Sequence, residues 1–217
     1  MSITVILVYV SIASGFLPLM AALYNYNQLD PILKLVALFC LVSAFFDLLE
    51  MILSWLQVHN NYPLLHLYDL LTILFFTAIY YQAFYESIFK KIALILGAAG
   101  LIAIICNAIL MERIWTYPSI SNTILSILLI ILSLTYFYQL LTRQEFVHID
   151  KQGLFWVNTG VLFYFSINIF LFMLYNKISE NVRNDFYMIQ SVTNIIANLL
   201  YSVGLLCKPQ KTTSSLY

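Results

Sequence analysis

Charged side chains are scarce in this chain of 217 residues. Lys, Arg, Asp and Glu together make up 9% of it, whereas 62% of the residues are hydrophobic. A soluble domain of this length cannot cover its surface with so few charges, so the composition indicates a protein of the lipid bilayer. Ten basic residues against ten acidic ones also leave no strongly basic surface for nucleic acid.

Cysteine and histidine are rare as well, with three of each. The cysteines lie singly, without metal-binding spacing, and we expect them to be packing residues. A zinc hydrolase needs two or three imidazole or thiolate ligands close together, but His148 falls at the opposite face of the membrane from His59 and His66. We predict no cofactor and no catalytic residue, and the sequence leaves a metal ion open. The cysteines are Cys40, Cys106 and Cys207.

Long hydrophobic runs make up most of the chain. A transmembrane helix needs about 20 mostly apolar residues, and seven such runs follow one another with short polar breaks. We predict an all-α polytopic membrane protein, with a seven-helix transmembrane bundle in residues 1–207 and a short polar cytoplasmic tail in 208–217. Pro18 should kink the first helix. The predicted spans are 3–24, 32–57, 64–85, 92–111, 119–141, 153–176 and 184–206.

Basic residues in the connections indicate how the bundle is oriented, because cytoplasmic loops carry an excess of Lys and Arg. An outside N-terminus puts seven of them on the inner side and three on the outer side, which favours an N-out, C-in arrangement. The first span lacks a basic leader and should remain as a membrane anchor. The inner set is Lys34, Lys90, Lys91, Arg143, Lys151, Lys208 and Lys211, and the outer set is Arg113, Lys177 and Arg183.

Polar side chains inside the spans are the candidates for function, since in hydrocarbon each must face protein, water or a ligand. They recur at helical spacing along five of the seven spans, all except the first and the fourth. We therefore predict that these five helices enclose a polar pocket open to the outside. The stripes contain Ser43, Asp47, Glu50, Ser54, His66, Asp69, Thr77, Tyr80, Asn122, Ser126, Ser133, Asn158, Asn168, Gln190, Asn194, Asn198 and Tyr201.

Three of these residues, Asp47, Glu50 and Asp69, are acidic, while no Lys or Arg lies in the middle of any span. A helical rise of about 1.5 Å per residue puts Glu50 and Asp69 roughly 9–12 Å below the outer surface. Burying three unpaired negative charges is prohibitive, so they must be protonated, share protons with each other or His66, or neutralise a cation. Asn, Ser and Thr often only join helices, whereas intramembrane carboxyl groups are functional candidates by default. The aromatic stretch 163–172 is expected to be lipid-facing and packing surface.

Three segments resemble a known family. The stretches "NNYPLLHLYDLLTILFFTAIYYQAFY" (60–85), "FWVNTGVLFYFSINIFLF" (155–172) and "IQSVTNIIANLLYSVGLL" (189–206) look like the small seven-helix membrane modules of certain bacteria. Such modules occur alone or as the input half of sensor histidine kinases. The resemblance implies a sensing role in the bacterial cytoplasmic (inner) membrane, with output through a separate cytoplasmic partner such as a histidine kinase.

We interpret the chain as a receptor-like sensor that binds a small ligand, a proton or a cation in the outer half of the bundle. Membrane lipids surround it, and the sequence leaves a homo-oligomer open. Two alternatives remain, a small-solute or ion transporter and a membrane-embedded lipid hydrolase. A retinal photoreceptor is excluded, because the last span has no Lys for a Schiff base. The predicted ligand-binding residues are Asp47, Glu50, His66, Asp69, Asn168, Gln190 and Asn194.

Overall fold

The computed structural model describes residues 3–58, 60–142 and 151–207, and this part of the chain contains helices and no strand. Seven helical segments are long and apolar enough to cross a membrane, which confirms the predicted all-α bundle. The first span combines α1 (Ile3–Ser14), α2 (Phe16–Asn25) and the 3-10 turn η1 (Tyr26–Gln28). The others are α3 (Pro31–Trp55), α4 (Tyr62–Ala83), α5 (Ser87–Leu110), α6 (Ser119–Thr142), α7 (Gly153–Leu174) with η3 (Tyr175–Lys177), and α8 (Glu180–Leu206).

The first span is broken at Gly15, between α1 and α2. A continuous helix would need a hydrogen bond from residue 18 to the carbonyl of Ser14, and Pro18 has no N–H to donate. Helix α1 ends at Ser14, and the Gly15 amide instead donates to the Ile12 carbonyl at 3.1 Å. The interruption that Pro18 predicts is therefore present, three residues before the proline.

Helix starts follow the local sequence. The Asp30 carboxylate accepts a hydrogen bond from the Leu33 amide at 2.7 Å, and Pro31 follows as the first residue of α3.

The predicted start of the fourth span at residue 92 is wrong, because α5 begins at Ser87 and includes Lys90. The long aliphatic stem of lysine lets its charge reach out of an apolar helix, and the Lys90 ammonium lies 5.9 Å from the ring centre of Tyr81.

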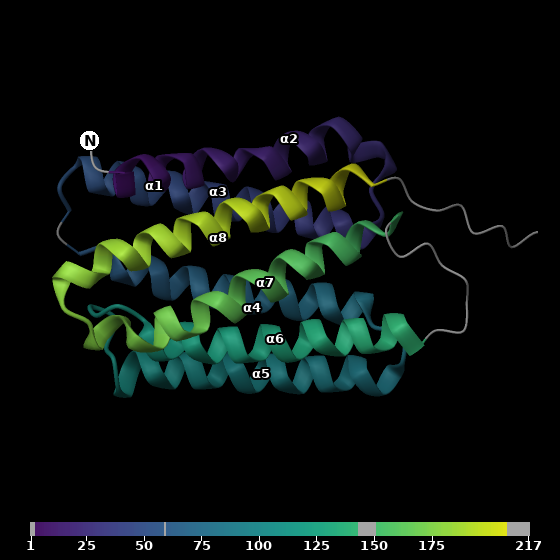
Figure 1. Cartoon of the computed structure of the whole chain (residues 1–217). Helices are drawn as coiled ribbons and strands as arrows, with labels where there is room; N and C mark the ends of the chain where they lie inside the picture. The colour runs from purple at the N-terminus through teal and green to yellow at the C-terminus, as the bar shows by residue number, and fades with distance from the viewer. Residues whose placement is uncertain (1–2, 59, 143–150, 208–217) are drawn as a thin grey trace, which may run out of the picture.

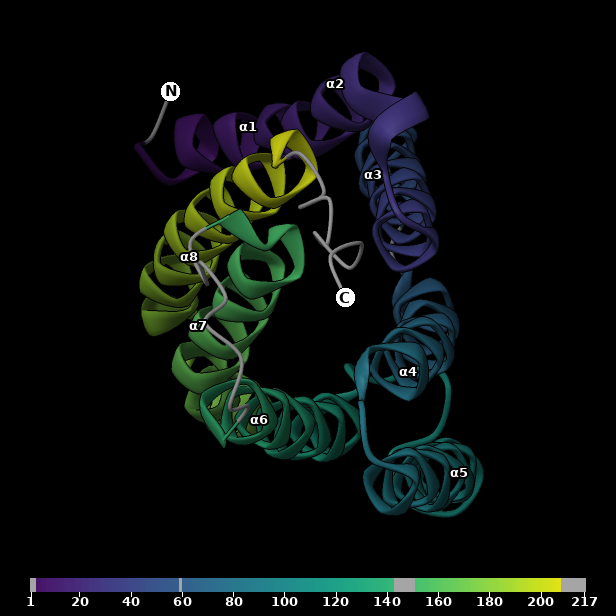
Figure 2. The ribbon, with the colours of Figure 1, turned by 90° about the vertical axis from the view of Figure 1, so that its right-hand side faces the viewer.

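The helices run side by side along the long axis of the molecule (Figure 1). Viewed from one end, α2, α3, α4, α6, α7 and α8 follow one another round a ring, and α5 lies outside it against α4 and α6 (Figure 2). We call the end with the start of α1 and the α3–α4, α5–α6 and α7–α8 connections the capped end. The opposite end holds the α2–α3 and α4–α5 connections and the end of α8.

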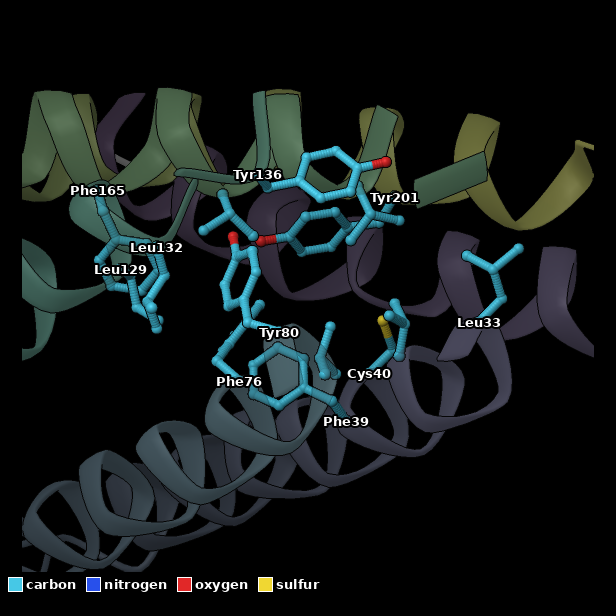
Figure 3. Packing of buried hydrophobic residues seen from close by; sticks show 14 of the residues in the cluster. Leu33, Phe39, Cys40, Phe76, Tyr80, Leu129, Leu132, Tyr136, Phe165 and Tyr201 are labelled. Carbon is cyan, nitrogen blue, oxygen red and sulfur yellow. The ribbon is translucent and has the colours of Figure 1, made fainter. Parts of the chain in front are cut away.

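Aromatic and aliphatic side chains fill much of the ring. Phe39, Phe76, Tyr80 and Tyr201 are buried, and Figure 3 shows them approaching one another from α3, α4 and α8. The rings of Phe39 and Phe76 meet edge to face with centres 4.7 Å apart. This cluster separates a polar network near the middle of the bundle from a cavity that lies closer to the capped end.

The polar network joins α4, α6 and α7. Tyr80 Oη donates to Asn158 Oδ1 at 2.6 Å and lies 2.7 Å from Ser133 Oγ, which in turn donates to Asn158 Oδ1 at 2.9 Å. The Asn158 Nδ2 donates to the Ser133 carbonyl at 3.2 Å. All three side chains are buried and bonded to each other, as expected for polar residues that hold membrane helices together.

Candidate ligand-binding site

A cavity of about 70 Å³ lies inside the ring, between α3, α4, α6, α7 and α8. These are the five spans on which the sequence places polar stripes. Its wall combines aromatic rings with hydroxyl, amide and carboxyl groups, and it contains no Lys or Arg. The wall is formed by Phe39, Ser43, Tyr68, Asp69, Thr72, Phe76, Asn122, Leu125, Tyr164, Phe165, Phe172, Asn194, Ala197, Asn198 and Tyr201.

Asp69 is the acidic residue of this wall. It lies on α4, about two helical turns from the capped end, and is only 2% exposed. Its Oδ2 atom is buried and has no hydrogen-bond partner. A carboxyl oxygen removed from water without a partner is costly, and Asp69 is one of the residues that line the cavity. The site is therefore suited to a group that brings a hydrogen-bond donor to Asp69.

Three amide side chains contribute to the wall, and each uses its nitrogen elsewhere. Asn194 donates to Ser11 Oγ on α1 and Asn198 donates to Ser14 Oγ, both at 2.9 Å. Asn122 donates to the carbonyl of Pro118, the residue just before α6, at 3.1 Å. Among the described residues, nothing donates to the three Oδ1 atoms. Each amide therefore keeps its acceptor oxygen, together with one N–H that is not used in these bonds.

The hydroxyl groups of the wall are mostly paired. Tyr68 Oη and Ser43 Oγ lie 2.9 Å apart and share a hydrogen bond. Tyr164 is hydrogen-bonded to the side chain of Gln190, which lies outside the wall. The Tyr201 hydroxyl is within electrostatic reach of that of Tyr80, and the two point towards each other in Figure 3. The tyrosines give the cavity a largely aromatic surface with few free donors.

Asp47 and Glu50 lie close to the cavity without lining it. Glu50 is within electrostatic reach of both Asp47 and Asp69, so the three carboxyl groups form one cluster. Asp47 Oδ2 would lie 3.5 Å from a Cβ atom placed on Gly15, and Asn198 Nδ2 would lie 4.0 Å from the same point. Asp47 is thus beside the break in the first span. No hydrogen bond from the described residues reaches Asp47 or Glu50.

His66 faces the capped end and is not part of the wall. It is 4% exposed, and its Nε2 lies 3.2 Å from the carbonyl oxygen of Thr116. A carbonyl can only accept, so Nε2 must carry the proton of this hydrogen bond. Nδ1 is buried without a partner. The imidazole therefore ties α4 to the α5–α6 connection, and it does not form an ion pair with Asp69.

Asn168 and Gln190 lie behind the wall. Asn168 is fully buried and donates to Thr193 Oγ1 on α8 and to the Tyr164 carbonyl, both at 2.8 Å. Gln190 supports the Tyr164 hydroxyl. Of the seven predicted ligand-binding residues, the structure places Asp69 and Asn194 at the cavity and the other five around it. Their ligand-binding roles stay predictions.

The α5–α6 connection, residues 111–118, forms a cap over this end of the ring. Asn60 Nδ2 donates to the Trp115 carbonyl at 2.8 Å, and Asn176 Nδ2 donates to the Tyr117 carbonyl at 3.1 Å. These bonds attach the cap to the α3–α4 connection on one side and to η3 on the other. The cap is thereby held by three separate parts of the chain, counting the contact with His66.

Tyr117 is the aromatic anchor of the cap. Its ring stacks on that of Tyr175, with centres 3.7 Å apart. Burial raises the pKa of its phenol well above the ordinary value, and the nearby Tyr164 and Asp69 raise it further. The hydroxyl therefore stays protonated at any physiological pH. Tyr117 links the cap electrostatically to Asp69 at the cavity.

Several residues at this site were not predicted from the sequence. Tyr68 was not among the predicted site residues. Tyr164, Phe165 and Phe172 belong to the stretch 163–172 that was expected to be lipid-facing and packing surface, and all three line the cavity. Glu112 in the cap was also missed, although it accepts hydrogen bonds from Asn107 Nδ2 at 2.7 Å and the Ile120 amide at 2.9 Å. An acidic residue just before a predicted helix start is the signal that could have identified Glu112.

The described residues contain no group of three or more His, Cys, Asp or Glu side chains arranged to hold a metal ion. The three carboxyl groups are close enough for electrostatic interaction, but they do not form such a group. Comparisons with protein-family models, curated proteins and solved structures give no match for this chain. Its function must be inferred from the site.

Proposed function

We propose that this chain is a receptor-like sensor that binds a small ligand in the cavity at Asp69. The observation that carries the proposal is that Asp69 lines the cavity and that its buried Oδ2 has no partner. A polar atom left unsatisfied in this way is costly unless a bound group satisfies it. Since all seven spans are apolar segments with short connections, changes in helix packing are the means by which binding is passed on.

The cap provides the second support for a sensor. Tyr117 is within electrostatic reach of Asp69, and His66, one turn before Asp69 on α4, holds the Thr116 carbonyl. A ligand that neutralises Asp69 changes its electrostatic interaction with Tyr117. A ligand that displaces Asp69 also moves this part of α4, and with it the hydrogen bond between His66 and the Thr116 carbonyl. In this proposal the protein lies in a bacterial cytoplasmic membrane with its capped end outside, and its output passes through a cytoplasmic partner such as a histidine kinase.

A transporter is less well supported by the geometry. Transporters often place matched pairs of broken helices at one substrate site. The first span is broken at Gly15, beside Asp47, but α3 to α8 are continuous in the described residues. Nothing in the described carboxyl cluster favours a metal-dependent lipid hydrolase either.

Thermal unfolding in lipid nanodiscs tests whether the cavity binds a solute. The probes are ammonium, methylammonium, potassium, acetate, acetamide and glycine, each at increasing concentration and constant ionic strength. We expect at least one probe to raise the unfolding temperature, because a ligand that binds only the folded state stabilises it. The measurement is the shift in the unfolding midpoint by intrinsic fluorescence.

Cavity filling provides the matched control for this experiment. Ala197 is 2% exposed and lines the cavity, so Ala197→Leu should abolish the shift. Ala98 lies on the exposed surface of α5, so Ala98→Leu adds the same atoms away from the cavity and should keep the shift. The sensor proposal is wrong if no probe stabilises the protein, or if both variants respond like the parent chain.

A further inference from the structure

We propose that the ligand is a small protonated amine, an ammonium or a short primary alkylammonium, whose N–H groups bind Asp69 and the neighbouring amide oxygens. This inference rests on the proposed ligand-binding function and names the chemical class of the ligand. It follows from the hydrogen-bonding capacity, the charge and the size of the cavity, which are independent properties of the wall.

Hydrogen-bonding capacity favours a donor. Each amide nitrogen of Asn122, Asn194 and Asn198 donates one of its two N–H groups to another protein group, and no described residue donates to their Oδ1 atoms. Asp69 adds an unpartnered carboxyl oxygen. The wall therefore contains four residues with an acceptor that no described residue uses. A primary ammonium has three N–H donors and no acceptor, which is the complementary pattern.

Charge favours a cation. The wall contains one carboxyl group and no Lys or Arg, and Glu50 and Asp47 lie in the same electrostatic cluster. An anion here would be repelled in a region of low dielectric, whereas a cation is attracted and receives charge-assisted hydrogen bonds. The rings of Tyr68, Phe76 and Tyr164 add aromatic faces to the wall, and cations bind favourably to such faces.

Size and geometry favour an amine over a metal ion. One water needs about 10–15 Å³ on the scale by which the cavity holds about 70 Å³, so a few atoms fit and an acyl chain does not. A divalent metal needs several ligands converging on one point, and the described carboxyl groups do not converge in this way. Hydrogen bonds from an ammonium tolerate acceptors that are spread over a wall.

Binding of methylammonium chloride to the protein in phosphatidylglycerol–phosphatidylcholine nanodiscs tests the ligand class, since these lipids carry no primary amine. The readouts are calorimetric Kd and the shift in unfolding temperature. We expect methylammonium to bind, and potassium, acetate and acetamide to bind at least about tenfold more weakly, because they lack either N–H donors or positive charge. Tetramethylammonium, which has charge but no N–H, should also bind weakly.

Variants identify the site. Asp69→Asn should weaken methylammonium binding by about tenfold or more, because it replaces a charge-assisted hydrogen bond by a neutral one. Glu50→Gln should weaken it less, since Glu50 acts only at a distance. Asp185→Asn removes a carboxyl from the exposed surface of α8 and should leave Kd unchanged. The unfolding temperature of each variant without ligand shows whether it is folded.

The outcomes separate this inference from the sensor proposal. Binding of acetate, acetamide or potassium as strong as that of methylammonium overturns the amine and leaves a ligand-binding cavity. Methylammonium binding that is equal in Asp69→Asn and the parent chain overturns the assigned site. If none of the probes binds, the sensor proposal fails together with the amine.

Discussion

Individual polar side chains inside this bundle differ in whether their hydrogen bonds are complete. Asp69, His66 and Asn168 each retain one buried polar atom without a partner, whereas Tyr80, Ser133 and Asn158 satisfy one another. Complete networks stabilise helix contacts, and incomplete ones are where a bound group has most to contribute. Only one of the incomplete residues, Asp69, lines the cavity.

The Tyr80–Ser133–Asn158 network predicts a stability effect. Asn158→Leu should lower the free energy of unfolding by about 1–3 kcal/mol, because it leaves two buried hydroxyl donors without their shared acceptor. Tyr80→Phe removes the hydroxyl group itself and so leaves no unpaired donor on residue 80. It should lower the free energy of unfolding by about 1 kcal/mol or less. Unfolding by SDS titration in mixed micelles measures both values.

A double-mutant cycle checks the coupling. Tyr80→Phe should cost less in the Asn158→Leu background than in the parent chain, because its partner is already gone. Equal costs in the two backgrounds would show that the Tyr80–Asn158 hydrogen bond contributes nothing to stability.

At the scale of the elements, helices α7 and α8 cross at two glycines. A Cβ atom on Gly153 would lie 2.3 Å from the Gly204 carbonyl oxygen, and one on Gly204 would lie 2.5 Å from that of Gly153. Small residues let membrane helices approach to backbone contact, where dispersion forces are strongest. The contact fixes the spacing of the two helices at the opposite end from the cap.

Gly204→Ala therefore predicts a loss of stability of about 1–3 kcal/mol, because the backbone must move to make room for the methyl group. Gly15→Ala is the milder comparison, since a Cβ there would lie 3.2 Å from the Ile12 carbonyl oxygen and 3.5 Å from an Asp47 carboxyl oxygen, both farther than the nearest backbone atom at Gly204. SDS titration of the two variants should show a clearly lower midpoint for Gly204→Ala and a smaller shift for Gly15→Ala. A similar loss in both would mean that any glycine replacement destabilises this bundle.

The elements also show how far the sequence determines the fold. Run length and hydropathy are properties of the local chain, so all seven spans were predicted, and Pro18 indicated the break at Gly15. The start of α5 was placed too late because two lysines at 90 and 91 look like a connection, although their stems allow them to lie on a helix.

The site was predictable to the level of helices. The polar stripes identified the five helices that line the cavity. They could not decide which stripe residue meets the cavity, because a helix can rotate by a fraction of a turn and the packing of its neighbours fixes that rotation. Tyr68 was missed because tyrosine is also common at membrane interfaces, and Tyr164 because it lies in the aromatic stretch 163–172, whose rings look like lipid-facing and packing surface.

At the scale of the whole molecule, the distribution of basic residues predicts that the capped end faces outward. Single cysteines in a background lacking Cys40, Cys106 and Cys207 can test this with a thiol reagent that does not cross membranes. In spheroplasts, Trp115→Cys in the cap should be labelled. Glu86→Cys in the α4–α5 connection should be labelled only after the membrane is opened; both positions are exposed. The reverse pattern would show that the orientation is N-in.

The amides of Asn194 and Asn198 have one more consequence. Each is a planar group on a residue that lines the cavity, and its nitrogen donates a hydrogen bond to a serine of the first helix. Because the oxygen and nitrogen of an amide share one rigid plane, a ligand that moves the oxygen of Asn194 or Asn198 also moves its nitrogen. A ligand that displaces either side chain therefore also changes its hydrogen bond to Ser11 or Ser14, next to the break at Gly15.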